Sequence, residues 1–288
     1  MSGTSVRPRR PTSLSPKEFD RVRELVESKL GVLVPEAKRA MVQSRLARRY
    51  RELGFNRIKD YCDYVFGEGA GTSEPARLLE AMTTNFTYFY REPQQLDYFA
   101  RQTLPNLIVD AAEHGRPLCV WSAACSTGEE PWTIAMLIDD VSTKLNRKID
   151  FSVKATDVNQ RVLETAERAV YTEAALDKLP AEWRARYFLF SRHSDSGRVR
   201  VTPAIRARVT FRPMNLMDEA YPVAREQNVI FLRNVLIYFD SETRQRVVGR
   251  LAEHLLPDGL LLLGASESLN GMNLPLQYLH RSIYRKQR

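Results

Sequence analysis

The sequence predicts an α/β protein built on a mostly parallel sheet, with an all-helical domain before it and a small antiparallel β-subdomain inserted in it. Three observations support this fold class. Residues 15–95 have helical periodicity and few strand signals, residues 96–288 alternate short β-rich runs with helices, and one turn-rich segment at about 172–210 interrupts the alternation. Alternating strands and helices are typical of a parallel sheet covered on both faces.

The chain begins with a basic tail, residues 1–14, which we expect to be disordered. The tail has no hydrophobic stretch, which argues against a secretory signal, and no apolar run approaches the ~18–20 residues that cross a bilayer. The three cysteines lack metal-ligand spacing, so we expect a reducing, cytoplasmic location and no metal site.

The positive charge is concentrated near the N-terminus. The whole chain has 43 Lys and Arg against 35 Asp and Glu, and residues 1–60 alone have 15 against 7. The rest of the chain is therefore balanced. This distribution favours a dedicated docking surface for an acidic partner over a protein coated with nucleic acid.

A basic helix is predicted within this segment, in "PEAKRAMVQSRLARRYRELG", and Gly54 is its expected stop. Its apolar stripe is formed by Val42, Leu46, Tyr50 and Leu53. One flank of the stripe gathers the basic side chains Lys38, Arg45, Arg48 and Arg49. Two interpretations remain open: a solvated helix face, or a docking flank for an acidic partner.

The second half of the chain supplies the predicted sheet. Its expected helices are "EEPWTIAMLIDDV", "NQRVLETAERAV" and "SETRQRVVGRLAEHLL". Its expected strands are "PLCVWSAA", "DFSVKATDV", "RVTFRPMNL", "NVIFLRNVL", "GLLLLGASES" and, as one edge strand, "QYLHRSIYRKQ". Between "RYFLF" and "RVRVTP" the turn "HSDSG" indicates the hairpin of the inserted β-subdomain.

The turn "WSAACSTGEEP" follows the first strand and opens a helix. Ser126 and Thr127 can cap that helix, and Gly128 permits a close backbone approach. Glu129 and Glu130 suit the helix dipole but would repel a pyrophosphate, so the turn favours a neutral or cationic ligand such as S-adenosylmethionine. The alternative is that both glutamates only stabilise the helix.

Three more constellations carry polar groups to places where ligands bind. Asp157 ends the second strand, where an acidic side chain can accept hydrogen bonds from a ribose. "TTNFTYFYRE" mixes polar and aromatic residues that could hold a sulfonium, or that could form a core segment between the domains. Arg233 and Asn234 interrupt an apolar strand at its C-terminal edge, where open α/β sheets bind ligands.

Together these stretches resemble the chemotaxis receptor glutamate methyltransferases, the CheR family. The matching segments are "TTNFTYFYRE", "WSAACSTGEEP", "ATDVNQRVLETAERAVY", "FLRNVLIYFD" and "LLLGASESL", in the family's order and within a match from about Lys17 to the end. The resemblance implies a class I, Rossmann-like methyltransferase domain, preceded by a helical domain and carrying an inserted β-subdomain. It also implies methyl transfer from S-adenosylmethionine to chemoreceptor glutamates, giving γ-methyl esters and S-adenosylhomocysteine.

By motif match the resemblance also implies the site residues. Arg91 and Tyr238 would lie at the reacting methyl group, with Arg91 paired to the carboxylate of the cofactor or of the substrate. The cofactor would be lined by Asn85, Thr87, Arg91, Ala124, Glu130, Asp157, Asn215, Leu216, Arg233 and Asn234. No general base is expected, because a glutamate is already ionised at neutral pH.

The expected partners are the cytoplasmic helices of chemoreceptors, docked on Lys38, Arg45, Arg48 and Arg49. The enzyme is expected to be a monomer that does not insert into the membrane. Docking of a receptor C-terminal peptide on the β-subdomain stays open, because only some members of the family use such a tether. Two rival functions conflict with the sequence. A nucleic-acid methyltransferase would carry an Asp/Asn-Pro-Pro-aromatic or Pro-Cys motif, and neither is present; a non-catalytic cofactor-binding module conflicts with the intact polar set.

Overall fold

The computed structural model describes residues 13–67, 71, 73–191 and 197–288. The chain forms two compact units, Met1–Thr84 and Asn85–Arg288. The sequence pattern placed the domain boundary at 95/96, and the division falls earlier along the chain. The predicted basic tail (1–14) lies almost wholly outside the described residues, and so does most of the predicted hairpin turn at 193–197.

The smaller unit is all-helical, as predicted. The capping box of Ser15 and Glu18 starts its first helix: the Ser15 hydroxyl accepts from the Glu18 N–H at 3.3 Å, and the Glu18 carboxylate accepts from the Ser15 N–H at 2.8 Å. Gly31, at φ 67°, ends that helix in the left-handed region. The helices are α1 (Pro16–Leu30), α2 (Arg39–Glu52, after a 3-10 turn at Glu36–Lys38), α3 (Ile58–Val65) and α4 (Ser73–Met82).

Helix α2 buries its predicted stripe through Val42, Leu46 and Tyr50, but it also buries Arg49, which is 4% exposed. The Arg49 guanidinium donates to both Glu74 carboxylate oxygens at 2.7 and 2.6 Å. Tyr61 donates its hydroxyl to the same carboxylate at 2.8 Å. Arg49 therefore stabilises the interior of the unit and does not lie on an exposed docking flank. A projection of α2 alone cannot show this, because the covering carboxylate comes from α4.

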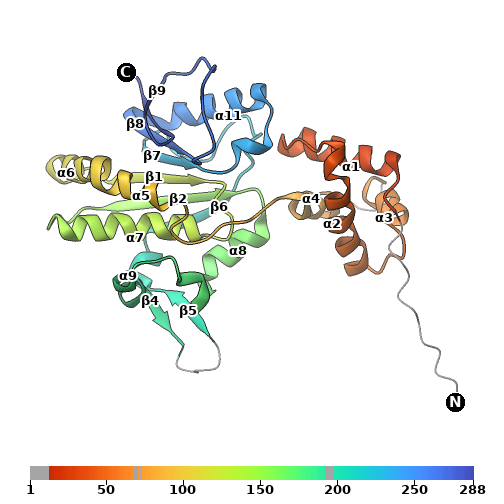
Figure 1. The fold of residues 1–288 in the computed structure, drawn as a ribbon, viewed down its shortest axis with the longest axis horizontal. Coiled ribbons are helices and arrows are strands. Elements are labelled where there is room, and N and C mark those ends of the chain that lie inside the picture. The colour runs from red at the N-terminus through yellow and green to blue at the C-terminus, as the bar shows by residue number, and fades with distance from the viewer. Residues whose placement is uncertain (1–12, 68–70, 72, 192–196) are drawn as a thin grey trace. The chain divides into compact units, whose positions relative to one another are not determined.

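The larger unit contains a seven-stranded sheet in the order β6-β2-β1-β7-β8-β10-β9 (Figure 1). Strands β6, β2, β1, β7 and β8 pair in parallel, which confirms the predicted mostly parallel sheet. The bounds are β1 (Leu118–Ala123), β2 (Phe151–Asp157), β6 (Val209–Pro213), β7 (Gln227–Leu232), β8 (Leu255–Leu263), β9 (Leu276–His280) and β10 (Ile283–Lys286).

The C-terminal segment forms two strands and not the single edge strand that its alternation suggested. Arg281 and Ser282 take φ values of 47° and 58°, so the chain turns back between β9 and β10. The two strands pair antiparallel, and β10 lies between β8 and the edge strand β9. An apolar–polar alternation continues through such a turn, so periodicity alone missed it.

Helices cover both faces of the sheet. The β1-to-β2 and β7-to-β8 connections run in opposite directions along it, so right-handed crossovers place their helices on opposite faces, as Figure 1 shows. The helices of the larger unit outside the insertion are α5 (Pro93–Tyr98), α6 (Leu104–His114, after a π-helical turn at Phe99–Thr103), α7 (Glu129–Lys144), α8 (Gln160–Arg168) and α11 (Ser241–His254).

A second, three-stranded antiparallel sheet forms within the insertion, in the order β3-β5-β4. Its strands are β3 (Val170–Thr172), β4 (Phe188–Phe190) and β5 (Arg198–Val201), with the short helices α9 (Ala181–Tyr187) and α10 (Pro203–Arg206) beside them. Leu189 and Phe190 of the edge strand β4 are about half exposed. The predicted antiparallel insertion is thus confirmed.

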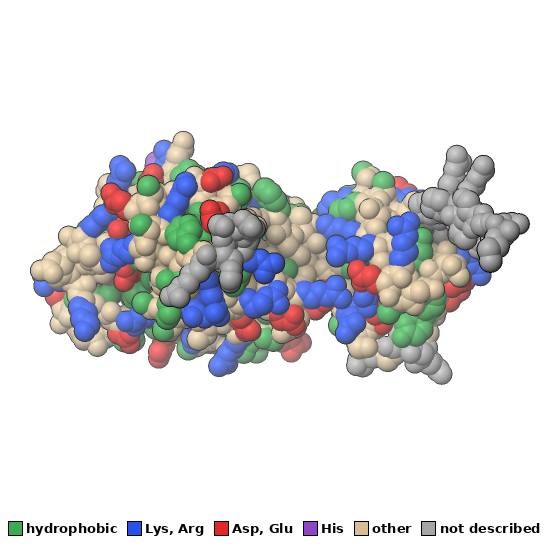
Figure 2. Space-filling view, turned by 90° about the horizontal axis from the view of Figure 1, so that it is seen from below, with side chains coloured by type: hydrophobic (Ala, Val, Ile, Leu, Met, Phe, Trp, Pro, Cys, Tyr) green, Lys and Arg blue, Asp and Glu red, His purple; other side chains and the backbone are tan. Residues whose placement is uncertain are grey.

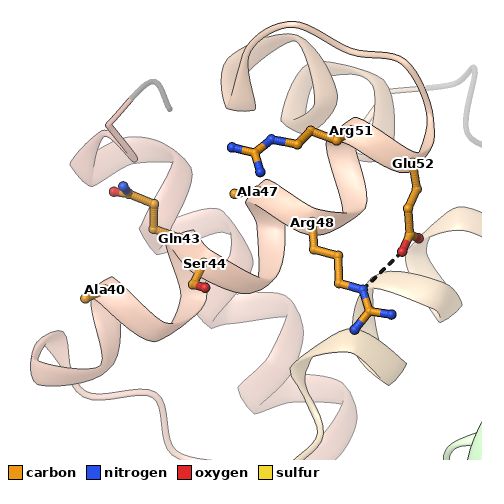
Figure 3. A pocket seen from close by; sticks show the side chains of 7 residues that line it. All are labelled: Ala40, Gln43, Ser44, Ala47, Arg48, Arg51 and Glu52. Atoms are coloured by element: carbon orange, nitrogen blue, oxygen red, sulfur yellow. Dashed lines mark hydrogen bonds and ion pairs between the residues drawn. The ribbon is translucent and has the colours of Figure 1, made fainter. Parts of the chain in front are cut away.

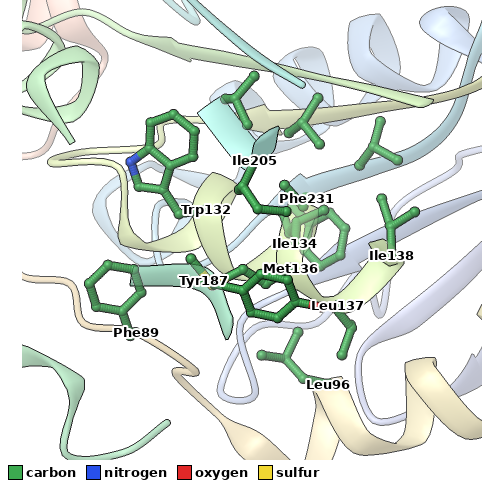
Figure 4. Packing of buried hydrophobic residues seen from close by; sticks show 14 of the residues in the cluster. Phe89, Leu96, Trp132, Ile134, Met136, Leu137, Ile138, Tyr187, Ile205 and Phe231 are labelled. Atoms are coloured by element: carbon green, nitrogen blue, oxygen red, sulfur yellow. The ribbon is translucent and has the colours of Figure 1, made fainter. Parts of the chain in front are cut away.

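One hydrophobic core joins the large sheet, its helices and the insertion (Figure 4). Phe89 is fully buried and packs edge-on against Tyr171 and Phe188 of the insertion, with ring centroids 4.9 and 5.5 Å apart. Trp132 of α7 packs on Phe211 of β6 in the same way. The contacts of Phe89 fix the segment before α5 against the insertion and position its polar residues.

No helix within the described residues is both long and apolar enough to cross a membrane. The described part of the chain also contains no group of three or more His, Cys, Asp and Glu side chains that could hold a metal ion.

Candidate cofactor and active site

The C-terminal ends of β2, β1 and β7 form the candidate site. Ala123 pairs with Thr156 and Ser122 pairs with Phe231, so the residues that follow the three strands lie level with one another. The strand order reverses between β1 and β7, and ligands of open α/β sheets bind at such a switch point. The parallel register therefore brings together the predicted residues Ala124, Asp157 and Arg233.

Asp157 holds the turn after β1 in place. Its carboxylate accepts from the Ser126 N–H at 2.8 Å and from the Asn159 N–H at 2.9 Å. The Ser126 hydroxyl donates to the Asn85 carbonyl at 2.9 Å, which links this turn to the segment before α5. Asp157 is 7% exposed, and burial raises the pKa of its carboxyl group above the ordinary value.

The turn after β1 has a left-handed backbone at three residues, with φ values of 63° at Ala124, 51° at Ser126 and 96° at Gly128. A Cβ at Gly128 would meet Ala166 Cβ at 2.7 Å, so only glycine fits there. Gly128 itself is the N-cap of α7, and no side chain caps the helix. The predicted caps are used elsewhere: Thr127 donates its hydroxyl to Glu129 at 2.6 Å.

The site is rich in buried carboxylates. Burial raises the pKa of Glu129 and of Glu130 above the ordinary value, although both side chains accept hydrogen bonds. Glu130 accepts from the Ser122 hydroxyl at 2.8 Å and from Arg233 at 3.1 Å. Arg233 thus partly compensates Glu130, whereas Glu129 has only the Thr127 hydroxyl as a side-chain donor.

Arg233 is the cation at the centre of the site, with a side chain that is 2% exposed. Its guanidinium donates to Glu130 at 3.1 Å, to Glu92 at 3.0 Å and to the Arg91 carbonyl at 2.5 Å. It therefore ties the end of β7 to the start of α7 and to the segment before α5. In this position Arg233 holds the walls of the site together.

Two further glutamates complete this network, and the sequence analysis gave neither a role. Burial acts to raise the pKa of Glu92, but Arg233, Asn234 and the Ala265 N–H outweigh it and hold the pKa below the ordinary value. The Glu267 carboxylate accepts from the N–H groups of Asn234 at 2.8 Å and Gly264 at 2.6 Å. Glu267 thereby supports Asn234 in its left-handed conformation, φ 60°.

The signals for both glutamates were present in the quoted motifs, "TTNFTYFYRE" and "LLLGASESL". What could not be predicted was the direction in which each side chain points. Glu92 itself takes φ 58°, which turns the chain into α5 and brings its carboxylate to Arg233 and Asn234.

The predicted adenine-flanking residues Asn215 and Leu216 follow β6 and lie close to Asp157. The Met214 N–H donates to the Asp157 carbonyl at 2.9 Å. Asn215 then forms a turn in which its side chain accepts from the Met217 N–H at 3.0 Å. Leu216 is buried, and Tyr221 donates its hydroxyl to the Leu216 carbonyl at 2.8 Å.

The remaining predicted residues lie on two segments of the same unit. Arg91 is half-buried and donates to the Phe86 carbonyl at 2.9 Å. Thr87 is half-buried on the same segment. Tyr238 ends the 3-10 turn Leu236–Tyr238, a few residues after Asn234, and is half-buried. Its place at the reacting methyl group stays a prediction.

The polar side chains of the site fit S-adenosylmethionine better than a nucleotide phosphate. The buried carboxylates of Glu129 and Asp157 suit an ammonium, a sulfonium and a ribose, and they would repel phosphate. The Asn234 Oδ1 atom is buried and has no hydrogen-bond partner among the described residues, so it is free to accept a bond from a ligand donor.

The smaller unit has a hollow of about 700 Å³ on the outer side of α2 (Figure 3). Small side chains form its floor, at Ala40, Ser44 and Ala47, and Arg48 and Arg51 flank it. Arg48 is 83% exposed and pairs with Glu52 at 3.2 Å. Basic side chains also appear on the face of this unit in Figure 2. Arg51 was not among the predicted docking residues, although it lies three positions after Arg48 on α2.

The other two predicted docking residues are engaged within the same unit. Lys38 is half-buried and donates to the Leu33 carbonyl at 3.1 Å. Arg45 is half-buried and donates to the Met82 carbonyl and, at 3.0 Å, to the Thr84 hydroxyl. Arg45 thus fixes the end of α4.

Comparison with known proteins gives matches along nearly the whole chain. The family described as "CheR methyltransferase, SAM binding domain" matches residues 85–284, and "CheR methyltransferase, all-alpha domain" matches residues 17–83. The chain is 31% identical over 277 residues to the chemotaxis protein methyltransferase of Borreliella burgdorferi, covering 95% of both chains. It is 34% identical over 273 residues to that of Escherichia coli (strain K12), covering 94% of this chain and 91% of the relative.

The Arg233 network yields a first prediction. Arg233→Met should leave Glu92 and Glu130 buried without a cation, which destabilises a protein by about 3 kcal/mol or more. Arg233→Lys should restore only part of this stability, because an ammonium cannot bridge both carboxylates. Urea denaturation measures the free energy of unfolding, and calorimetry measures binding of S-adenosylhomocysteine, which should weaken in parallel.

The exposed pair Arg225–Glu253, 2.9 Å apart, supplies the matched control. Arg225→Met should lower the free energy of unfolding by no more than about 1 kcal/mol. Equal losses from Arg225→Met and Arg233→Met would show that the buried network has no special structural weight.

Asp157 yields a pH prediction. Ribose hydroxyls donate to the ionised carboxylate, so protonation of Asp157 should weaken binding of S-adenosylhomocysteine. Because burial raises its pKa, affinity should begin to fall, as pH decreases, at a pH above the ordinary aspartate pKa of 3.8. Asp157→Asn should bind more weakly and lose much of this pH dependence. Identical pH profiles of the two proteins in calorimetric titrations would refute the ribose assignment.

Proposed function

Because the chain belongs to the CheR methyltransferase family, and is thus a chemotaxis methyltransferase dependent on S-adenosylmethionine, we propose that it methylates glutamate side chains of chemoreceptors. The product would be a glutamate γ-methyl ester. The cytoplasmic helices of receptors would be the substrate.

One observation carries the proposal: the carboxylates of half-buried Glu129 and Glu130 and of buried Asp157 gather at the strand ends of a methyltransferase fold. Such a site favours a cationic methyl donor, and Arg233 is already occupied by Glu92 and Glu130. An anionic substrate must therefore approach from outside this acidic interior. A glutamate carboxylate meets that condition when cations line the entrance.

The reaction requires the protein mainly to position the methyl donor and the carboxylate. S-adenosylmethionine supplies the methyl group, and a glutamate with a pKa of about 4.3 is already a nucleophile at neutral pH. We propose that Asp157 holds the ribose, that Asn215 and Leu216 flank the adenine, and that Thr87, Ala124 and Asn234 line the rest of the cofactor. Arg91 and Tyr238 would orient the reacting groups. Orientation of this kind can be equivalent to effective concentrations of about 10⁵ M.

We propose that Arg48 and Arg51 form the docking surface for the receptor helix. The small side chains Ala40, Ser44 and Ala47, which precede them on α2, let another helix approach closely, and the two guanidinium groups can meet its carboxylates. Lys38 and Arg45 do not line the hollow, and Arg49 is excluded by its burial.

Methyl transfer from radiolabelled S-adenosylmethionine to purified receptors tests the proposed function. The label should be released as methanol by mild base, because carboxyl esters are base-labile. Arg91→Ala should abolish transfer, and the exposed Arg101→Ala should retain it. Each receptor is assayed with and without its C-terminal tail, because the exposed edge of β4 could accept an extended peptide as an extra strand. Base-stable label, or transfer only to nucleic acid, would contradict the proposal.

Charge reversal tests the docking surface. The double variant Arg48→Glu/Arg51→Glu should raise the receptor KM roughly fivefold to tenfold and should lose most of the salt dependence of activity. Its affinity for S-adenosylhomocysteine should stay at the wild-type value. Lys17→Glu/Lys59→Glu changes the net charge equally at exposed lysines of α1 and α3 and should leave KM unchanged. A wild-type KM in the Arg48/Arg51 variant would favour the solvated-face interpretation.

A further inference from the structure

Lys178, in the insertion between β3 and α9, reaches the segment that carries the predicted site residues Thr87 and Arg91. Its Nζ atom lies 3.6 Å from the centroid of the Tyr88 ring. Arg91 lies over the same ring, with Cζ 5.8 Å from its centroid. Two cations from distant parts of the sequence thus meet at one aromatic side chain beside the predicted site.

These two cations have little negative charge around them. Within the described residues, no carboxylate lies in ion-pair distance of Lys178, which is exposed. The neighbouring Asp177 faces Arg184 instead, at 3.9 Å. Arg91 donates to a backbone carbonyl and not to a carboxylate. Both charges remain available to an incoming anion.

The rim also has an apolar part. Phe86 is 72% exposed and packs edge-on against Tyr88, with ring centroids 5.9 Å apart. Arg91 lies 5.8 Å from the Phe86 ring as well. An exposed aromatic pair beside two cations suits a substrate segment that presents a carboxylate among apolar side chains.

The segment that carries Tyr88 contacts an acidic part of the same unit: the Asn85 carbonyl accepts from the Ser126 hydroxyl, and the Ser126 N–H donates to Asp157. Glu129 and Glu130 follow in the same turn. A substrate carboxylate that moves inward is repelled by these groups unless cations at the entrance compensate. Only a positive rim makes such a site accessible to a glutamate side chain.

We propose that Lys178 is a substrate-binding residue: held on Tyr88 opposite Arg91, it receives the carboxylates of the acidic receptor helix and so favours acidic over neutral segments. This inference rests on the proposed function. It assigns to the insertion a direct part in substrate selection, through a cation–π contact that positions the ammonium while leaving it exposed.

The test measures steady-state methylation of a purified chemoreceptor cytoplasmic domain by the full-length enzyme. Lys178→Gln should raise the receptor KM roughly two- to fivefold, the effect expected of one exposed ion pair, with kcat and the Kd for S-adenosylhomocysteine unchanged. Lys178→Arg should keep the KM within about twofold of wild type, because it retains the charge. Lys148→Gln, at an exposed lysine before β2 and thus at the opposite edge of the sheet, is the control and should behave as wild type.

A second readout, fluorescence anisotropy, follows binding of the labelled receptor domain to enzyme saturated with S-adenosylhomocysteine, and Lys178→Gln should weaken this binding by a similar factor. An unchanged KM and unchanged binding in Lys178→Gln would overturn the inference while leaving the proposed function intact. So would an equal loss of affinity for S-adenosylhomocysteine, because Lys178 would then act on the cofactor segment. Failure of the wild-type enzyme to methylate any receptor would instead contradict the proposed function, and the binding measurement would still decide the part played by Lys178.

Discussion

The site depends on one buried guanidinium. Arg233 joins the end of β7 to Glu130 at the start of α7 and to Glu92 before α5, so three segments far apart in the sequence meet at one side chain. Buried ion pairs often add little net stability, because desolvation offsets the attraction between the charges. Their geometric demands are strict, however, and here they fix where the backbone carbonyls, carboxylates and strand ends must lie.

The Arg233 network also determines the charge of the site. Arg233 pairs with Glu92 and Glu130, and Glu129 and Asp157 have no cationic partner among the described residues. The consequence is a site that attracts positive charge inside while Arg91 and Lys178 present positive charge at its rim. In the proposed reaction, a methyl donor with a sulfonium and an acceptor with a carboxylate would require opposite environments, which these two sets of residues would provide.

In the smaller unit, one arginine of α2 is buried in an ion pair and its neighbour is exposed. Arg49 and Glu74 are both about 5% exposed and form a bidentate ion pair, and Tyr61 donates a hydrogen bond to Glu74. Arg48, at the preceding position of the helix, is 83% exposed. Adjacent arginines of one helix therefore have a structural and a surface role. The exposed Arg48 pairs only with Glu52 at the surface, where a partner's carboxylate could compete for it.

The sequence by itself determined the fold class and which segments form the parallel strands and their helices, and it predicted which residues lie at the ends of those strands. Strand periodicity, the single glycine at Gly128 and the acidic pair after it are local features, and they need no knowledge of distant contacts. The tertiary structure decided what depends on side-chain direction. It placed Arg233 between Glu92 and Glu130, buried Arg49 against Glu74 and brought Lys178 over Tyr88. Each of these pairs joins residues from different elements, and no spacing along the chain records which side chains face one another once the elements pack.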